Sequence, residues 1–105
     1  MTEPAWTRAL PFDDVFQGDV IALALNGRDL AVYGIDGAVH VTDNACTHGM
    51  ARLCEGFLEG HEIECPMHQG RFDVRTGAPT CAPALLPIRV YPVKVEGGEV
   101  FIALD

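Results

Sequence analysis

The fold of this chain is decided by residues 46–72, which read CTHGMARLCEGFLEGHEIECPMHQGRF. The stretch contains two Cys–His pairs, Cys46 with His48 and Cys65 with His68, and sixteen residues separate the pairs. Thiolate and imidazole ligands together suit zinc, copper or an iron–sulfur centre. A glycine follows each pair closely and lets backbone N–H groups approach a negatively charged group. The sequence therefore predicts a metal centre held by two loops.

The spacing inside the first pair bears on which metal is bound. Only Thr47 separates the two ligands there, whereas paired zinc ligands are usually two to four residues apart. One spacer suits a loop that offers its two ligands to two different metal atoms. Structural zinc in an interaction module remains the chemical alternative. A catalytic cysteine with a histidine base is disfavoured, because the sequence indicates neither an orienting group nor a substrate pocket.

The chain on both sides of this stretch has the pattern of short β-strands. Asn26-Gly27, Asp36-Gly37 and Gly97-Gly98 predict tight hairpin turns. Strands are expected at Trp6 to Leu10, Val20 to Leu25, Leu30 to Tyr33, Ala38 to Thr42, Glu62 to Glu64, Arg71 to Asp73, Ile88 to Val95 and Val100 to Leu104. Three prolines in residues 79–87 exclude a continuous ladder there. This layout predicts an all-β fold, an antiparallel sandwich or barrel that carries an inserted metal-binding lobe.

Composition limits the location and the partners. The chain has 105 residues, 49% of them apolar, and a formal net charge of -8. Such an acidic protein should repel phosphate backbones, so nucleic acid is not expected as a partner. The sequence has neither the apolar core of a signal peptide nor a membrane-spanning run, and a cytoplasmic protein without membrane contact is expected. In that reducing compartment the four cysteines favour metal binding over disulfides.

The two Cys–His segments resemble the cluster-binding boxes of Rieske proteins. The first is Cys46-Thr47-His48, and the second continues from Cys65 through Gln69-Gly70-Arg71-Phe72-Asp73. The wider context, at residues 43–49, 56–60 and 91–94, resembles ferredoxin components of naphthalene-dioxygenase-type ring-hydroxylating systems. The resemblance covers nearly the whole chain. It implies a Rieske fold with a [2Fe-2S] cluster, in which Cys46 and Cys65 hold one iron and His48 and His68 hold the other.

The resemblance also implies a division of the chain and a function. A single Rieske domain, residues 1–105, would comprise a basal β-domain of about residues 1–42 and 84–105 and a cluster-binding subdomain of about residues 43–83. The protein would be a monomeric one-electron carrier and not an enzyme. It would pass electrons from a flavin-dependent ferredoxin reductase to a Rieske/non-haem-iron terminal oxygenase. The alternative is the small Rieske subunit of an assimilatory nitrite reductase.

Four positions depart from the respiratory branch of the family. Ala51 and Met67 stand where that branch has the cysteines of a disulfide between its two cluster loops. Gly70 and Phe72 stand where it has a serine and a tyrosine whose hydroxyls donate to the cluster and its cysteine sulfur. Because fewer donors stabilise the reduced cluster, the potential is expected at the low end of the Rieske range, about -150 mV.

The remaining reactive residues are expected to have structural roles. Cys54 and Cys81 are expected to be small, partly buried side chains. His40 and His61 are expected at the surface. The proline-rich segment, residues 79–87, is expected to cover the open side of the cluster. Acidic residues near the cluster would steer partners in a salt-sensitive way.

Overall fold

The computed structural model describes residues 5–47, 51–67, 69–82, 84 and 86–104. Within them the chain forms three antiparallel sheets, with strand orders β1-β11-β10, β2-β3-β4-β9 and β5-β6-β7-β8, called here the first, second and third sheets. Two 3-10 turns, Phe12–Asp14 and Leu53–Glu55, are the helical elements of the described residues. The strands are β1 Trp6–Pro11, β2 Val20–Leu25, β3 Arg28–Ile35, β4 Ala38–Asp43, β5 Phe57–Glu59, β6 Glu62–Glu64, β7 Arg71–Asp73, β8 Pro79–Cys81, β9 Val90–Tyr91, β10 Val93–Glu96 and β11 Glu99–Ala103.

The second sheet is a meander whose turns the sequence predicted correctly. Asn26 and Gly27 have φ values of 50° and 79°, and Asp36 and Gly37 have 52° and 80°. Positive φ at both central residues matches the right-handed twist of the flanking strands. The register is continuous from Val20↔Tyr33 to Leu25↔Arg28 across β2 and β3. The predicted hairpins are therefore confirmed.

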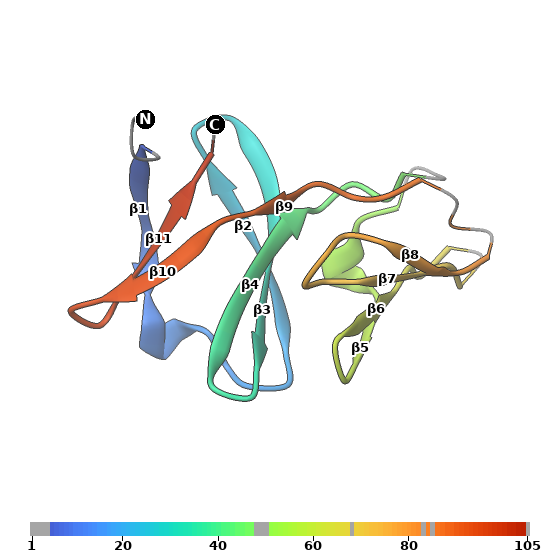
Figure 1. Ribbon diagram of the computed structural model, residues 1–105, viewed down its shortest axis with the longest axis horizontal. Helices are drawn as coiled ribbons and strands as arrows, with labels where there is room; N and C mark the ends of the chain where they lie inside the picture. The colour runs from blue at the N-terminus through green and yellow to red at the C-terminus, as the bar shows by residue number, and fades with distance from the viewer. Residues whose placement is uncertain (1–4, 48–50, 68, 83, 85, 105) are drawn as a thin grey trace.

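Strand β3 is the centre of the molecule, because both of its faces are buried. Leu30 and Val32 pack into a core between the first and second sheets, together with Val41, Val100 and Ile102. The alternate residues Ala31, Tyr33 and Ile35 pack in the opposite direction, against residues of the third sheet. A strand buried on both faces has a continuous apolar sequence, here LAVYGI. Figure 1 shows the third sheet at one end of the molecule and the first sheet at the other.

The strand predicted from Ile88 to Val95 is wrong in one respect, because the chain forms two strands there. β9 pairs with β4 in the second sheet, and β10 pairs with β11 in the first. Pro92 separates them and has no N–H group to donate to a ladder. Its carbonyl accepts a hydrogen bond from Ala103 N at 3.0 Å. Pro92 thus marks the point where the chain changes sheets.

The third sheet was predicted only in part. Its central strands β6 and β7 lie where the sequence predicted them, with Ile63 opposite Phe72 and both side chains fully buried. The outer strands β5 and β8 were missed, because three residues are too few to show alternation. β8 begins with Pro79 at the edge of the sheet, a position where the missing N–H is tolerated. Among the described residues, no helix has the length and apolarity needed to cross a membrane.

Candidate metal centre

The structure places Cys46 and Cys65 at the bases of two similar loops. Cys46 follows the end of β4, and its N–H donates to the carbonyl of Ala51 at 3.0 Å. Cys65 follows β6 directly, and its N–H donates to the carbonyl of Gly70 at 2.7 Å. Each loop is therefore closed by a hydrogen bond from its cysteine to the fifth residue beyond it.

The two cysteines are buried in the same core. Cys46 is 5% exposed and Cys65 is fully buried, and both belong to the cluster of side chains that includes Leu53, Ile63 and Phe72. The predicted ligands His48 and His68 lie outside the described residues. In sequence, each belongs to one of the two closed loops. The structure thus brings the two predicted sulfur ligands into one apolar environment.

The proline-rich segment, residues 79–87, is hydrogen-bonded to the first loop, residues 46–51. Thr47, the residue between the two predicted ligands, donates its hydroxyl to the carbonyl of Leu86 at 2.8 Å. Further along, Ile88 N donates to the carbonyl of Gly77 at 2.9 Å. A Cβ atom on Gly77 would lie 2.1 Å from Ile88 O, so only glycine allows this approach. The covering role of the segment stays a prediction.

The two loops and the segment before Arg89 have few charged residues in their sequence. Residues 44–51, 65–70 and 77–88 contain His48 and His68 but no Asp, Glu, Lys or Arg. Met67 and Leu86 are large apolar side chains that are 41% and 64% exposed. A sparsely charged, partly apolar surface suits close contact with another protein.

Acidic side chains gather instead on the third sheet, where Arg71 is surrounded by three glutamates. Its guanidinium lies 2.9 Å from Glu64, 3.3 Å from Glu59 and 3.5 Å from Glu62. The arginine neutralises only part of this group. The negative charge that could steer a partner therefore lies beside the loops and not on them.

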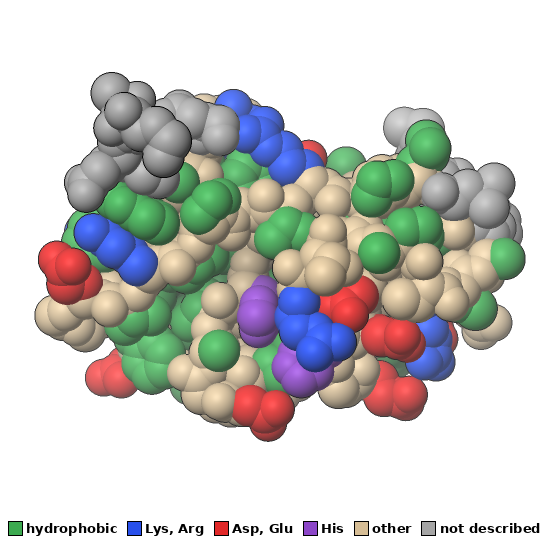
Figure 2. Space-filling view, viewed as in Figure 1, with side chains coloured by type: hydrophobic (Ala, Val, Ile, Leu, Met, Phe, Trp, Pro, Cys, Tyr) green, Lys and Arg blue, Asp and Glu red, His purple; other side chains and the backbone are tan. Residues whose placement is uncertain are grey.

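His40 and His61 meet where the second and third sheets approach each other. Their ring centroids are 6.1 Å apart in an edge-to-face arrangement, and the two imidazoles lie together in Figure 2. Both side chains are half-buried and still reach the surface, as expected, and there they face each other. Burial is the main cause that lowers the pKa of His40, and the nearby His61 and Arg75 lower it further.

The other two cysteines differ from each other. Cys54 is partly buried, as predicted, and accepts a hydrogen bond from the side-chain amide of Asn44 at 3.2 Å. Cys81 is exposed at the end of β8, so the prediction of partial burial is wrong there. β8 has three residues and lies at the edge of the third sheet, so it has a neighbouring strand on one side only. Both cysteines are free thiols, and the disulfide between them that the sequence disfavours does not form.

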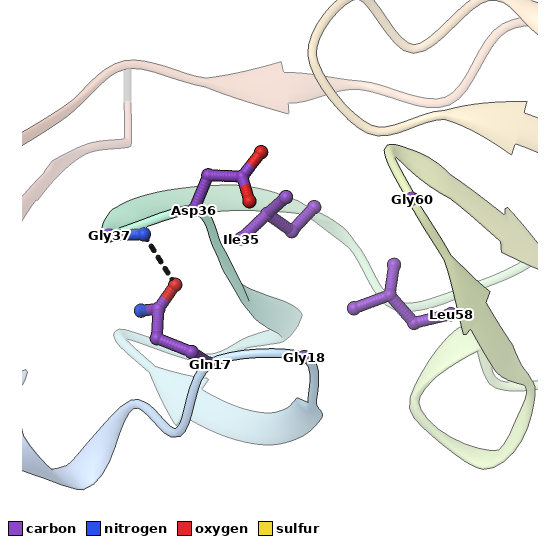
Figure 3. Close-up of a pocket in the computed structure, with 7 residues that line it drawn as sticks. All are labelled: Gln17, Gly18, Ile35, Asp36, Gly37, Leu58 and Gly60. Carbon is purple, nitrogen blue, oxygen red and sulfur yellow. Dashed lines mark hydrogen bonds between the residues drawn. The ribbon is translucent and has the colours of Figure 1, made fainter.

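A cleft of about 390 Å³ separates the β3–β4 turn from the β5–β6 turn (Figure 3). Gln17 lines it, and its side-chain oxygen accepts a hydrogen bond from Gly37 N at 2.6 Å. Leu58 points from the third sheet toward Ile35 of β3. The lining residues do not include any of the four cysteines. The cleft therefore lies apart from the candidate metal centre.

Comparison with protein families decides the identity of this fold. Residues 5–92 match the model of the Rieske [2Fe-2S] domain. The chain belongs to the Rieske family. It is 52% identical to the ferredoxin component of a naphthalene 1,2-dioxygenase system from Pseudomonas aeruginosa, over 105 residues that cover 100% of each chain.

Solved Rieske ferredoxins share the whole fold. The ferredoxin of carbazole 1,9a-dioxygenase from Nocardioides aromaticivorans superposes with a TM-score of 0.92 and 39% identity, over 96% of this chain and 99% of that one. A ferredoxin in complex with the oxygenase of carbazole 1,9a-dioxygenase gives a TM-score of 0.88 and 38% identity, over 96% and 94% of the two chains. The predicted all-β Rieske fold is confirmed.

A nitrite reductase relationship is supported less well. A small subunit assigned to an NADH-dependent nitrite reductase from Mycobacterium tuberculosis has a TM-score of 0.86 but only 21% identity, over 99% of this chain and 98% of that one. Likeness at that identity extends to the fold alone. The relatives near 50% identity are ferredoxin components of dioxygenase systems.

The described residues fit the cluster that the family carries. A Rieske [2Fe-2S] cluster needs two thiolates on one iron and two imidazoles on the other. Two thiols already converge in one buried core, at the bases of loops that each contain one more predicted ligand. Sequence reasoning missed the parts that close these loops, Ala51 O and Gly70 O, because a backbone carbonyl leaves no signal in the residue type.

Proposed function

We propose that this Rieske ferredoxin carries single electrons from a flavin-dependent ferredoxin reductase to the Rieske/non-haem-iron terminal oxygenase of an aromatic ring-hydroxylating system. The observation that carries the proposal is the pair of buried cysteines at the bases of two loops, in a chain that matches dioxygenase ferredoxin components along its full length. The oxygenase as a partner is further supported by the ferredoxin–oxygenase complex of carbazole 1,9a-dioxygenase.

We propose Cys46 and Cys65 as the ligands of one iron, and His48 and His68 as the ligands of the other. The bound cluster supplies a site that accepts and returns one electron. The chain supplies the surroundings: burial of both cysteines keeps water from the sulfurs, and the sparsely charged loops let a partner approach closely. Neither task requires a catalytic residue on this chain.

We also propose a division of the chain, an oligomeric state and a location. The basal β-domain comprises about residues 1–42 and 84–105, and the cluster-binding subdomain about residues 43–83. The third sheet, built from residues 57–81, supports this division. The protein acts as a monomer in the cytoplasm, without membrane contact. Cys54 and Cys81 as free thiols are compatible with that reducing compartment.

Serine variants of the cysteines test the ligand assignment. Cys46→Ser and Cys65→Ser should lose the red-brown absorbance and the electron paramagnetic resonance signal of the reduced protein, whose g-average lies below that of all-cysteine clusters. Cys54→Ser and Cys81→Ser are the matched controls and should keep both signals. A cluster retained in Cys46→Ser, or a colourless wild-type protein that contains zinc, would contradict the assignment.

Reconstitution tests the carrier role. The purified protein should be reduced by a flavin-dependent ferredoxin reductase and should then reduce a ring-hydroxylating oxygenase, and product should not form when the ferredoxin is left out. Stable co-purification with a large sirohaem subunit would favour the nitrite reductase alternative instead.

A further inference from the structure

Asn44 is a fully buried polar residue that lies two positions before Cys46. Its side-chain oxygen accepts a hydrogen bond from Cys54 N at 2.8 Å. Its side-chain nitrogen donates to the carboxylate of Asp29 at 3.1 Å and to the sulfur of Cys54 at 3.2 Å. The amide thus uses its acceptor and both donor directions, which is what burial of a polar group requires.

The backbone of Asn44 is held as firmly as its side chain. Its N–H donates to Asp29 O at 3.0 Å, and its carbonyl accepts from Leu53 N at 2.7 Å. The next residues, Ala45 and Arg52, form an isolated antiparallel bridge. One step further, the Cys46–Ala51 hydrogen bond closes the loop. Residues 44–46 are therefore paired along the backbone with residues 51–53, and this pairing begins at Asn44 and ends at Cys46.

Asp29 is itself oriented toward Asn44 by an arginine. Arg52 donates from Nε to one carboxylate oxygen at 3.0 Å and from a terminal nitrogen to the other at 2.8 Å. The hydrogen bond from Arg52 is the main cause that lowers the pKa of Asp29, and the hydrogen bond from Asn44 lowers it further. An ionised carboxylate accepts only, so the group facing it must be a donor. An amide at position 44 meets this requirement and a carboxylate does not.

We propose that Asn44 is a positioning residue for the first cluster loop. By joining Asp29 of the β2–β3 hairpin to Cys54 of the 3-10 turn at Leu53–Glu55, it fixes the direction in which the chain leaves β4 and enters Cys46. It acts on Cys46 through the backbone pairings that join residues 44–46 to residues 51–53. The inference rests on the proposed role of Cys46 as an iron ligand.

The test is the rate at which the purified holoprotein releases iron to a coloured chelator. Asn44→Asp turns the donor into a second carboxylate facing Asp29 and should speed release about 10–100-fold, the usual effect of losing a partner that orients a metal ligand. Asp29→Asn keeps an acceptor for Asn44 but loses one of the two carboxylate oxygens that accept from Arg52, so its release should rise less than in Asn44→Asp. The double variant Asn44→Asp/Asp29→Asn restores one donor opposite one acceptor and should recover most of the loss.

Val100→Ala controls for general destabilisation, because Val100 is fully buried in the core between the first and second sheets. It should lower the thermal midpoint without the same increase in iron release. The proposal is overturned if release in Asn44→Asp only follows the fall in thermal midpoint seen for Val100→Ala, or if the double variant releases iron as fast as the single one. Failure of the ligand assignment would appear separately, as a Cys46→Ser variant that keeps its cluster.

Discussion

Phe72 shares its core with Cys65, and it is fully buried. Its ring fills space but has no hydroxyl to donate to a sulfur. Gly70, also buried, closes the second loop through its backbone carbonyl and likewise has no side-chain donor. Reduction adds negative charge to an iron–sulfur cluster, and hydrogen bonds to the sulfurs stabilise that charge. The residues of the second loop therefore favour a low potential, about -150 mV.

Replacing Phe72 by tyrosine should raise the midpoint potential. A new O–H donor that gains about 1.4 kcal/mol on reduction corresponds to about 60 mV for one electron. The measurement is a redox titration of the variant and the wild type. Phe101→Tyr, at a half-buried position on β11, is the matched control and should leave the potential unchanged. A potential that stays constant or falls in Phe72→Tyr would contradict the donor argument.

At the scale of the elements, the β5–β6 hairpin determines the position of Cys65, because Cys65 directly follows strand β6. Gly56 lies just before β5 and packs directly against the backbone at the end of β6. A Cβ atom there would lie 1.9 Å from the carbonyl oxygen of Glu64, the residue before Cys65. Contact between backbones, and not a left-handed conformation, therefore requires glycine at position 56.

Gly56→Ala should destabilise the fold by about 3 kcal/mol, because backbone atoms must move to relieve the overlap. Gly60→Ala in the β5–β6 turn is the comparison. Position 60 has open space around it but a φ of 60°, so alanine should cost about 1 kcal/mol through strain alone. Urea unfolding of both variants measures the difference. Equal losses in the free energy of unfolding would show that the structure relieves the close approach to Glu64 without an energetic cost.

At the scale of the whole molecule, the third sheet contacts the second through residues whose proximity the sequence did not predict. His40 belongs to β4, and His61 belongs to the β5–β6 turn. Asp73 and Arg75 form an ion pair at 2.8 Å beside them, and both influence His40. The imidazole contact therefore belongs to the region where the two parts of the molecule pack together.

Acidification should weaken this contact. Because the pKa of His40 is lowered in the folded protein, the unfolded chain binds more protons between the two pKa values. The stability from neutral His40 is present above about pH 6.5, the ordinary pKa, and is lost as pH falls through the lowered one. Thermal midpoints at about pH 7.5 and about pH 5.5 should fall less in His40→Gln than in the wild type. Equal pH dependence in both proteins would exclude a contribution from His40.

The distribution of charge makes a second prediction at this scale. The sparsely charged loops limit short-range charge contacts, while the glutamates around Arg71 and the net charge of -8 act over a Debye length of about 8 Å. The rate of reduction by the reductase should therefore fall as salt rises. Glu59→Gln/Glu62→Gln should flatten the salt dependence and leave the rate at high salt unchanged. Stopped-flow measurements over a salt series test this, and a wild-type rate indifferent to salt would refute steering.

Much of this structure is local and could be read from the sequence. Asn26-Gly27 and Asp36-Gly37 specify their turns because few residue pairs accept positive φ at both positions. The central strands of the third sheet also lie where Ile63 and Phe72 alternate with charged neighbours. The division at Pro92 was missed, because a proline shows where a ladder stops but not that the next strand joins another sheet.

The sequence by itself predicted the kind of centre, since Cys46, His48, Cys65 and His68 lie in segments that resemble the Rieske ligand boxes and the type of residue carries that chemistry. Only the tertiary structure decided how the site is supported. The burial of both cysteines, the two loop closures and the contacts of Asn44 with Asp29 and Cys54 all join segments distant in sequence or depend on backbone atoms. Backbone carbonyls are the same in every residue, so only the folded structure determines which of them accept these hydrogen bonds.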